Sequence, residues 1–396
     1  MRRTGTIAIG IKAPIIRQGD DLVAITLDSI KKAREELGFS VDDRDVICIT
    51  EAVVAKSQGN FVTVDEIAID LKRKFAHMKE NEALGVVFPI MSRNRFSLIL
   101  KGIAKAFPKV VIQLSLPTDE VGNPLIDEEE YYRLGFDFLN QTMDEEEFRS
   151  HFPKPLHPFT GVDYPEYYKE VAGKEAKIIF SNNPLAILAY TSNVIVANIH
   201  KRALTKRILE KGGVKKVVAL DEIMNEPVGN SGCHPLYGVL GSNKSTEESL
   251  KLFPRDSQWL VETIQKRIFE ETGKKVEVMV YGDGAFKDPV GGIWELADPV
   301  VSPFHTAGLV GTPNEIKFKY VVDTALHELT GNVAEMALQE LILNKEASLL
   351  GKEVSLGTTP RRYTDLLGSL ADLMGGSGDK GTPIIYIKGY FDNYAS

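Results

Sequence analysis

The chain has 396 residues and a formal net charge of −8, and hydrophobic and charged residues make up 43% and 26% of it. The length predicts two or three compact units, or one core with large insertions, and the balance of residue types excludes a disordered or fibrous chain. The acidic excess argues against a general nucleic-acid-binding protein, which needs cations to neutralise phosphates. Two cysteines, Cys48 and Cys233, and no apolar run near the roughly 18 to 20 residues of a membrane span predict a reduced, cytoplasmic protein.

Short apolar runs alternate with helical patterns in the first 116 residues. The helix predicted between the first two strands has Asp20 or Asp21 placed to cap it, and Thr63 and Glu66 form a capping box that opens a helix to about Met78. The other elements expected here are strands at Thr6–Ile11, Val46–Thr50 and Val110–Leu116, and helices at Leu22–Leu37 and around Phe96–Phe107.

From residue 117 to about residue 174, prolines, acidic residues and aromatic residues crowd together, which indicates an insertion with long loops and no core of its own. Periodicity returns at Ala176. We expect strands at Lys177–Phe180, Asn193–Ala197, Val217–Leu220, Lys275–Tyr281 and Pro383–Lys388, and helices at Lys201–Lys211, Ser257–Thr272, Tyr320–Leu343 and Tyr363–Met374. The absence of a regular βαβ rhythm favours an α+β fold with mixed and antiparallel sheets over a doubly wound sheet.

The loop Met374–Pro383 is rich in glycine and lies between a helix and a strand. Its glycines, which are Gly375, Gly376, Gly378 and Gly381, would let successive N–H groups face a phosphate. Asp379 could hold a cation and Lys380 could screen phosphate charge. The alternative is a glycine-capped surface turn, and the P-loop spacing is absent.

A second loop, Tyr281–Gly292, directly follows an apolar strand. Asp283 and Asp288 could supply oxygen ligands to a hard cation, although an Asp-Gly turn is the alternative. Arg93 and Arg95 in the sequence SRNR could bind a carboxylate or phosphate bidentately, and a solvated loop is the alternative there.

Three further segments each allow a binding role and a structural one. Gly10–Leu22 could clamp a flat ring by its backbone, or simply connect a strand to a helix. Lys56 follows a buried strand and could bind a ligand, or be solvated. Asn243 could hydrogen-bond a ligand from a loop, whereas Cys233 and His234 lack the partners of a zinc site. No GxSxG or HExxH motif supports a hydrolase triad or a zinc protease.

Taken in order, these five segments resemble the coenzyme F420-0:γ-glutamyl ligase family. GIKAPIIRQGDDL is similar to its N-terminal motif, VVAKSQGN to its lysine segment, and YGVLGSN to its asparagine segment. TGKKVEVMVYGDGAFKD is similar to its aspartate-containing strand end, and ADLMGGSGDKGTPIIYIKG to its C-terminal loop. The resemblance covers residues 9–60 and 236–389. It therefore predicts a ligase core formed by residues 1–116 and 231–396, with an inserted or divergent middle region at 117–230.

The resemblance implies a ligase that joins glutamate, or a similar amine, to a small-molecule carboxylate through an acyl phosphate. It implies GTP or ATP as the nucleotide, Mg²⁺ or Mn²⁺ as the cation, and a homodimer. Catalysis would fall to Asp283 and Asp379. Nucleotide contacts would come from Ala13, Pro14, Ile15, Ile16, Lys56, Asn243, Gly375, Gly376, Gly378, Lys380 and Gly381, and metal contacts from Asp283, Asp288 and Asp379.

The sequence also departs from the family at three expected oxygen ligands, which fall on Leu240, Gly284 and Gly376. Because a hard cation needs several oxygens, metal binding must be rebuilt, weakened or lost, with Asp288 and Asp379 as substitutes. A non-catalytic nucleotide- or metabolite-binding relative is therefore the alternative to an enzyme. An unrelated phosphate-handling hydrolase is a third possibility, which predicts nucleotide turnover without an amine.

Overall fold

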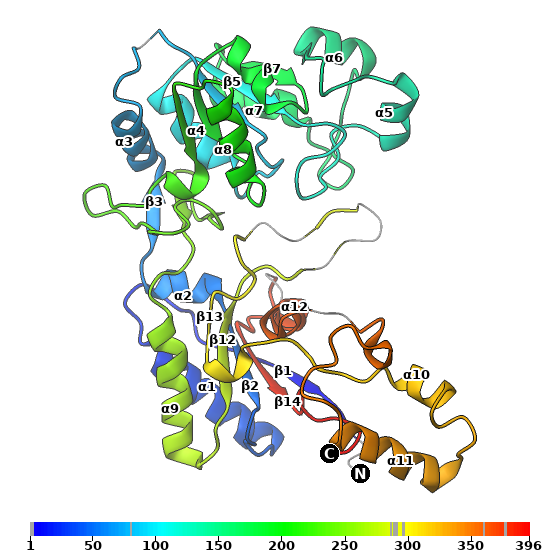
Figure 1. Ribbon diagram of the computed structural model, residues 1–396. Coiled ribbons are helices and arrows are strands. Elements are labelled where there is room, and N and C mark those ends of the chain that lie inside the picture. The colour runs from blue at the N-terminus through cyan, green and yellow to red at the C-terminus, as the bar shows by residue number, and fades with distance from the viewer. Residues whose placement is uncertain are drawn as a thin grey trace.

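The computed structural model describes residues 4–79, 81–285, 287, 292–294, 298–358, 361–375 and 378–396. Figure 1 shows two units, one built on a five-stranded sheet and the other on a six-stranded sheet, joined through a small three-stranded sheet. The chain is α+β, with parallel and antiparallel strand pairs, as predicted. None of the helices in the described ranges combines the length and the apolar character needed to cross a membrane.

The five-stranded sheet joins strands from both ends of the chain. Its order is β1 (Ile7–Ile11), β14 (Ile384–Lys388), β2 (Val46–Thr50), β12 (Glu277–Tyr281) and β13 (Phe304–His305). Strands β2 and β12 are parallel, and the other neighbouring pairs are antiparallel. The strand predictions in this sheet are confirmed to within two residues. The sheet brings the segments that carry the family resemblance together.

Helices cover both faces of this sheet, which explains why its central strands are almost entirely buried and mostly apolar. Helices α1 (Leu22–Leu37) and α9 (Gln258–Thr272) pack on one face, in a core cluster that includes Ile47 and Ile49. Helix α12 (Tyr363–Gly375) packs on the other face, against Cys48 and its neighbours. The predicted cap of α1 is confirmed, because Asp21 accepts a hydrogen bond from the Ala24 N–H at 3.0 Å.

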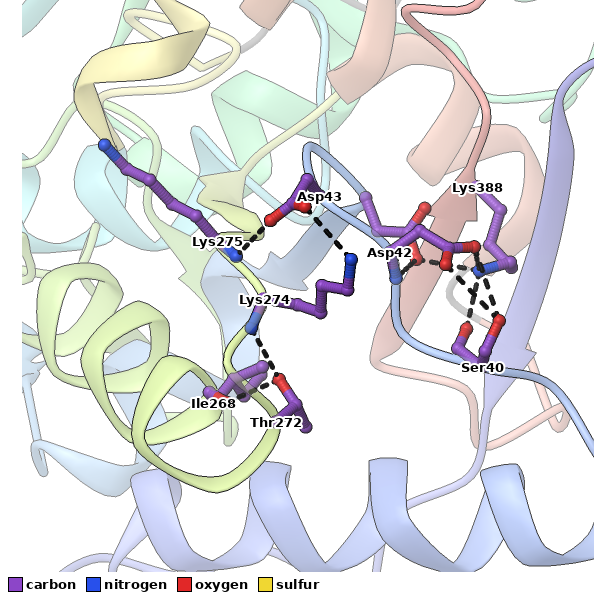
Figure 2. A network of polar contacts seen from close by, with 9 residues as sticks. Ser40, Asp42, Asp43, Ile268, Thr272, Lys274, Lys275 and Lys388 are labelled. Atoms are coloured by element: carbon purple, nitrogen blue, oxygen red, sulfur yellow. Dashed lines mark hydrogen bonds and ion pairs between the residues drawn. The ribbon is translucent and has the colours of Figure 1, made fainter.

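Charged side chains tie the strands together at the end of this sheet where β2 begins (Figure 2). Lys388 donates to the Ser40 carbonyl at 2.6 Å and to the carboxylates of Asp42 and Asp45 at 2.8 Å each. Asp43 accepts from the Lys275 N–H at 2.8 Å. The hydrogen bond from Lys388 lowers the pKa of Asp42. These contacts give the end of the sheet a structural role, so the opposite end is the place to seek a ligand site.

The six-stranded sheet has the order β6, β7, β5, β4, β8 and β9. These strands span Met143–Asp144, Lys177–Phe180, Val110–Leu114, Leu84–Val87, Asn193–Val196 and Lys216–Ala219, respectively. All neighbouring pairs are parallel except β6 with β7. If the five parallel strands are numbered by their order in the chain, their order across the sheet is 3-2-1-4-5, which is a doubly wound topology.

Helices flank this second sheet on both sides. Helices α4 (Ser97–Ala106) and α7 (Tyr164–Ala172) contribute to the core on one face, together with α3 (Val64–Lys74). Helix α8 (Arg202–Lys211) and the short helix η1 (Pro184–Ala189) pack on the other. This βαβ arrangement was not predicted, because strand β4 is a short apolar run without alternation and gives no periodic signal.

Apolar side chains between residues 117 and 174 belong to the same core as this sheet. Phe138, Phe148 and Tyr168 are buried in the cluster that also contains strands β4 and β5. Helices α5 (Glu128–Leu134) and α6 (Glu145–His151) lie within the same segment. Strands that precede and strands that follow residue 116 therefore share one sheet. The division of the chain into a ligase core and a middle region at 117–230 stays a prediction.

One predicted helix is wrong in the structure. The expected continuous helix Tyr320–Leu343 is divided into α10 (Phe318–Asp323) and α11 (Gly331–Leu343). Gly331 has a φ of 58°, in the left-handed region, and a right-handed helix does not continue through that conformation. The apolar period of the sequence is the same on both sides of the break, so periodicity alone did not reveal it.

Two chain crossings connect the units. They lie near α2 (Glu51–Ser57) and near the three-stranded sheet of β10 (Asn243–Lys244), β11 (Ser249–Lys251) and β3 (Phe61–Thr63). Asn60 links the two crossings. Its side-chain amide donates to the Phe253 carbonyl at 2.9 Å, and its backbone carbonyl accepts from the Leu252 N–H at 2.8 Å. Buried hydrogen bonds of this kind fix how the units meet.

Candidate active site

A cavity of about 840 Å³ lies where the two units meet. This volume is within the range of roughly 300 to 1,000 Å³ that is usual for small-molecule sites. The first unit contributes Thr50, Glu51, Ala52, Lys56, Tyr281, Gly282, Asp283 and Asp372, and the rest of the wall is Phe61, Ser92, Asn94, Arg95, Asn243, Lys244, Ser245 and Lys251.

The cavity opens at the carboxyl ends of two parallel neighbours. Strand β2 ends at Thr50 and strand β12 ends at Tyr281, and these two residues are paired in register. The residues that follow them, Glu51 and Gly282, therefore emerge side by side at the sheet edge. Ligands bind at this edge in parallel sheets because the loops that leave it are free to vary.

A buried ion pair forms one wall of the cavity. Lys251 contacts both carboxylate oxygens of Glu51, one of them at 2.5 Å, and the two residues are only 7% and 5% exposed. Burial raises the pKa of Glu51 to about 7, although the Lys251 charge acts in the opposite direction. The site thus holds a carboxyl group whose proton affinity suits acid–base chemistry near neutrality.

Arg95 reaches from the loop after β4 into the first unit and binds two carboxylates there. Its guanidinium lies 3.1 Å from Asp298 Oδ1 and also contacts Asp283 Oδ2. The Asp283 N–H donates to the other oxygen of Asp298 at 2.9 Å. Burial works against the charged form of Arg95, yet the charges of Asp298 and Asp283 raise its pKa above the usual value.

Gly282 is required for this arrangement. A Cβ atom at that position would lie 2.1 Å from Asp298 Oδ2. Arg95 makes one contact to each of two carboxylates of the chain itself, and the binding of a ligand carboxylate or phosphate by Arg93 and Arg95 stays a prediction. Asp298 was not predicted as a site residue, since it lies 203 positions from Arg95 and no local pattern links the two.

A family model for the F420-0:gamma-glutamyl ligases matches residues 10–389, nearly the whole chain. The chain belongs to this family. The match extends across the six-stranded sheet, beyond the two stretches in which the motifs are recognisable by eye. No curated protein sequence matches the chain.

The residues that the family resemblance singles out are only partly brought together. Lys56, Asn243 and Asp283 come from three distant segments and line the same cavity. Glu51, Lys251 and Asp372 line it too and were not predicted as site residues. For Lys251 a signal did exist, since a lysine within the apolar strand sequence SLKLF needs a buried partner.

The N-terminal segment lies against the C-terminal glycine loop. The Ala13 N–H donates to the Gly381 carbonyl at 3.3 Å. Ile16 is buried in the core, whereas Ile15 is 79% exposed and Pro14 is exposed as well. Ile15 and Pro14 are therefore the members of this segment that a ligand could reach.

The end of the C-terminal loop meets the rim of the cavity. The Pro383 carbonyl accepts from the Thr50 N–H at 3.0 Å, and Thr382 donates to the Gly375 carbonyl at 3.3 Å. A Cβ atom on Gly375 would lie 2.6 Å from the Tyr281 hydroxyl, so close packing requires this glycine. The middle of the loop is exposed and contributes no residue to the described lining of the cavity; this part is Gly378, Asp379, Lys380 and Gly381. Gly376 lies outside the described residues.

The predicted metal ligands do not form a resident site in the described part of the chain. Within those ranges, no three His, Cys, Asp or Glu side chains are grouped to hold a metal. Asp288 lies outside the described residues, and Leu240 is an apolar side chain only 2% exposed. A divalent cation at Asp283 would compete with Arg95, so the described residues do not fit such an ion there.

Proposed function

We propose that this member of the family joins an amine, glutamate or a similar amino acid, to a small-molecule carboxylate in the cavity between the units. GTP or ATP would activate the carboxylate. The observation that carries the proposal is the convergence of Lys56, Asn243 and Asp283 on one cavity, with the glycine loop ending at its rim. A cytoplasmic location and a homodimer stay predictions; both cysteines are free thiols, which agrees with a reducing compartment.

In the first step, an oxygen of the acceptor carboxylate attacks the γ-phosphorus of the nucleotide, and the bond to the bridging oxygen breaks. This gives an acyl phosphate and a nucleoside diphosphate. Such a transfer depends mainly on positioning and on neutralising phosphate charge. Lys56 is suited to this role because its side chain is exposed and forms no ion pair with any described residue.

In the second step, the amine attacks the acyl carbon, the carbon–oxygen bond to phosphate breaks, and inorganic phosphate leaves. The amine must lose a proton as the amide forms. Glu51 is the carboxylate proposed to accept it, because its pKa of about 7 lies near the working pH. Mg²⁺ or Mn²⁺ would enter with the nucleotide as its complex, and no step is assigned to a resident metal.

A non-catalytic relative that binds a nucleotide or metabolite is the second candidate. It is favoured by one observation, which is that Arg95 occupies the Asp283 carboxylate. The two candidates differ in turnover and share a nucleotide site.

The test combines thermal denaturation with phosphate release. GTP or ATP with Mg²⁺ or Mn²⁺ should raise the melting temperature, and glutamate with a panel of carboxylates should release phosphate. Stabilisation without release in any combination would favour the binding protein. If the protein shows neither stabilisation nor phosphate release, both candidates are ruled out. Release of phosphate that needs no amine would indicate a hydrolase.

A further inference from the structure

The six-stranded sheet has a carboxyl edge of its own, with the topological switch point between β4 and β8. Doubly wound sheets bind ligands in the crevice outside this point. The loops that leave the edge here are 88–96 after β4, 115–127 after β5 and 197–201 after β8. The loop after β4 is also the one that carries Arg95 into the cavity described above.

The chain itself fills the crevice at the switch point. The Glu120 carboxylate accepts hydrogen bonds from the N–H groups of Ile199, His200 and Lys201, at 2.6, 3.0 and 2.6 Å. These N–H groups precede α8, so the Glu120 carboxylate takes a position at the N-terminus of a helix that another anion could otherwise occupy. Beside them, Leu240 and its neighbours leave a gap of about 20 Å³. The side of the crevice next to α8 is therefore filled by the chain itself.

A second cavity, of about 210 Å³, remains open beside the filled crevice. Its polar wall is Ser92, Arg93, Asn94, Arg95, Asn123, His157, Thr160 and Tyr164, and its apolar wall is Ile90, Met91, Val121, Ile293 and Trp294. Asp119 fixes two of the contributing loops, because its carboxylate accepts from the N–H groups of Met91 at 2.7 Å and Val121 at 3.0 Å. The cavity is thus built on a buried, hydrogen-bonded frame.

Among the described residues, the polar lining includes a cation that has no ion-pair partner. Arg93 is exposed to the cavity and forms no ion pair with any residue that the structure describes. The neighbouring imidazole of His157 is neutral. Its Nδ1 accepts from the Thr160 N–H at 3.3 Å, so Nε2 carries the proton and donates to Asn123 at 3.1 Å. Burial, and next the Arg93 charge, lower the pKa of His157.

The apolar wall is attached to the same frame. The backbone N–H of Trp294 donates to the backbone carbonyl of Val121 at 2.7 Å, which fastens this part of the first unit to the loop after β5. The lining of the cavity thus includes both an indole and a guanidinium, and these two groups define what fits there. Arginine favours planar carboxylates and phosphates, and indole favours apolar or aromatic groups.

We propose that this second cavity binds a small organic anion, with its carboxylate or phosphate monoester facing Arg93 and a flat apolar body against Trp294. Its volume is below the usual range for drug-sized ligands, so the occupant is a small molecule or one end of a larger one. Ser92, Asn94 and Arg95 line both cavities. This last step rests on the proposed function. If that function holds, the occupant is one end of the acceptor molecule, which holds the acceptor in place.

Trp294 provides the test, because the chain has two tryptophans and the other, Trp259, is exposed on α9. In the Trp259→Phe protein, benzoate and phenyl phosphate are each titrated without nucleotide, and benzamide serves as the uncharged probe. At least one of the two anions should change Trp294 fluorescence saturably, and benzamide should not. Arg93→Gln should weaken that binding about tenfold or more, and Arg93→Lys should weaken it less.

The matched control is Arg207→Gln, which removes an exposed arginine on α8 that does not line the cavity. It should leave binding unchanged. The proposal is overturned if neither anion gives a saturable response, if benzamide responds equally, or if Arg93→Gln binds as the parent does. Binding of an anion without phosphate release in any acceptor assay would refute the proposed function and leave this site standing.

Discussion

The two units present similar sheet edges to each other and use them differently. In the five-stranded sheet, the ends of β2 and β12 open into a charged cavity of about 840 Å³. In the six-stranded sheet, the switch-point crevice is filled by Glu120 and Leu240. Both edges follow the topology that favours ligand sites. Topology therefore marks where a site can form, and the side chains of the loops decide whether it stays open.

The largest expected effect comes from breaking the buried ion pair at the open edge. Lys251→Met leaves the Glu51 carboxylate buried without its cation, and we expect about 3 to 5 kcal/mol less stability to unfolding by urea. The Glu51→Gln, Lys251→Met double variant should recover a large part of that loss, because it leaves no buried charge. A Lys251→Met protein within about 1 kcal/mol of the parent would contradict the pairing.

The second prediction concerns the contact that joins the two edges. Arg95→Gln removes the cation from Asp283 and Asp298, and should cost roughly 2 to 4 kcal/mol in urea unfolding. It should also let Mn²⁺ bind more tightly than to the parent, as followed by the loss of the free-ion signal in electron paramagnetic resonance. The double variant Arg95→Gln, Asp283→Asn should lose that gain in Mn²⁺ affinity, because it no longer has the Asp283 carboxylate. If the parent already binds Mn²⁺ tightly and Asp283→Asn abolishes that binding, the role given to Arg95 is contradicted.

A third change tests whether the open edge binds a nucleotide. Lys56→Met should weaken the affinity for GTP or ATP about tenfold, or roughly 1.4 kcal/mol, in calorimetric titrations. Its effect on unfolding should be small, because the side chain is exposed. Lys319→Met, at an exposed position of α10, is the control. Equal affinities in the two variants would remove Lys56 from the site.

The smallest expected effect lies at the closed edge. Glu120→Gln keeps one acceptor oxygen for three N–H groups, and should cost about 1 to 2 kcal/mol in urea unfolding. Nucleotide affinity should stay as in the parent, since this edge is filled. A loss of nucleotide affinity as large as that of Lys56→Met would show that the two edges are not separate.

Much of the first unit could be predicted because its signals are local. The bounds of β2 and α1 follow from a short apolar run and from a helical period capped by Asp21, and the structure reproduces both ranges. The glycine loop and the Lys56 segment were recognisable from residue types and order alone. Strand β4 was missed because four apolar residues have no period, and without it the order of the second sheet could not be inferred.

The sequence by itself thus determined the fold class, the family and most of the elements, since each depends on neighbours along the chain. Only the tertiary structure decided which charges meet. Lys251 lies 200 positions from Glu51, and Arg95 lies 188 from Asp283. These pairs form because the crossings and the two sheet edges bring distant loops together in a setting with little water, where an unpaired charge is costly. The same packing filled the crevice at Glu120 and left the cavity at Arg93 open.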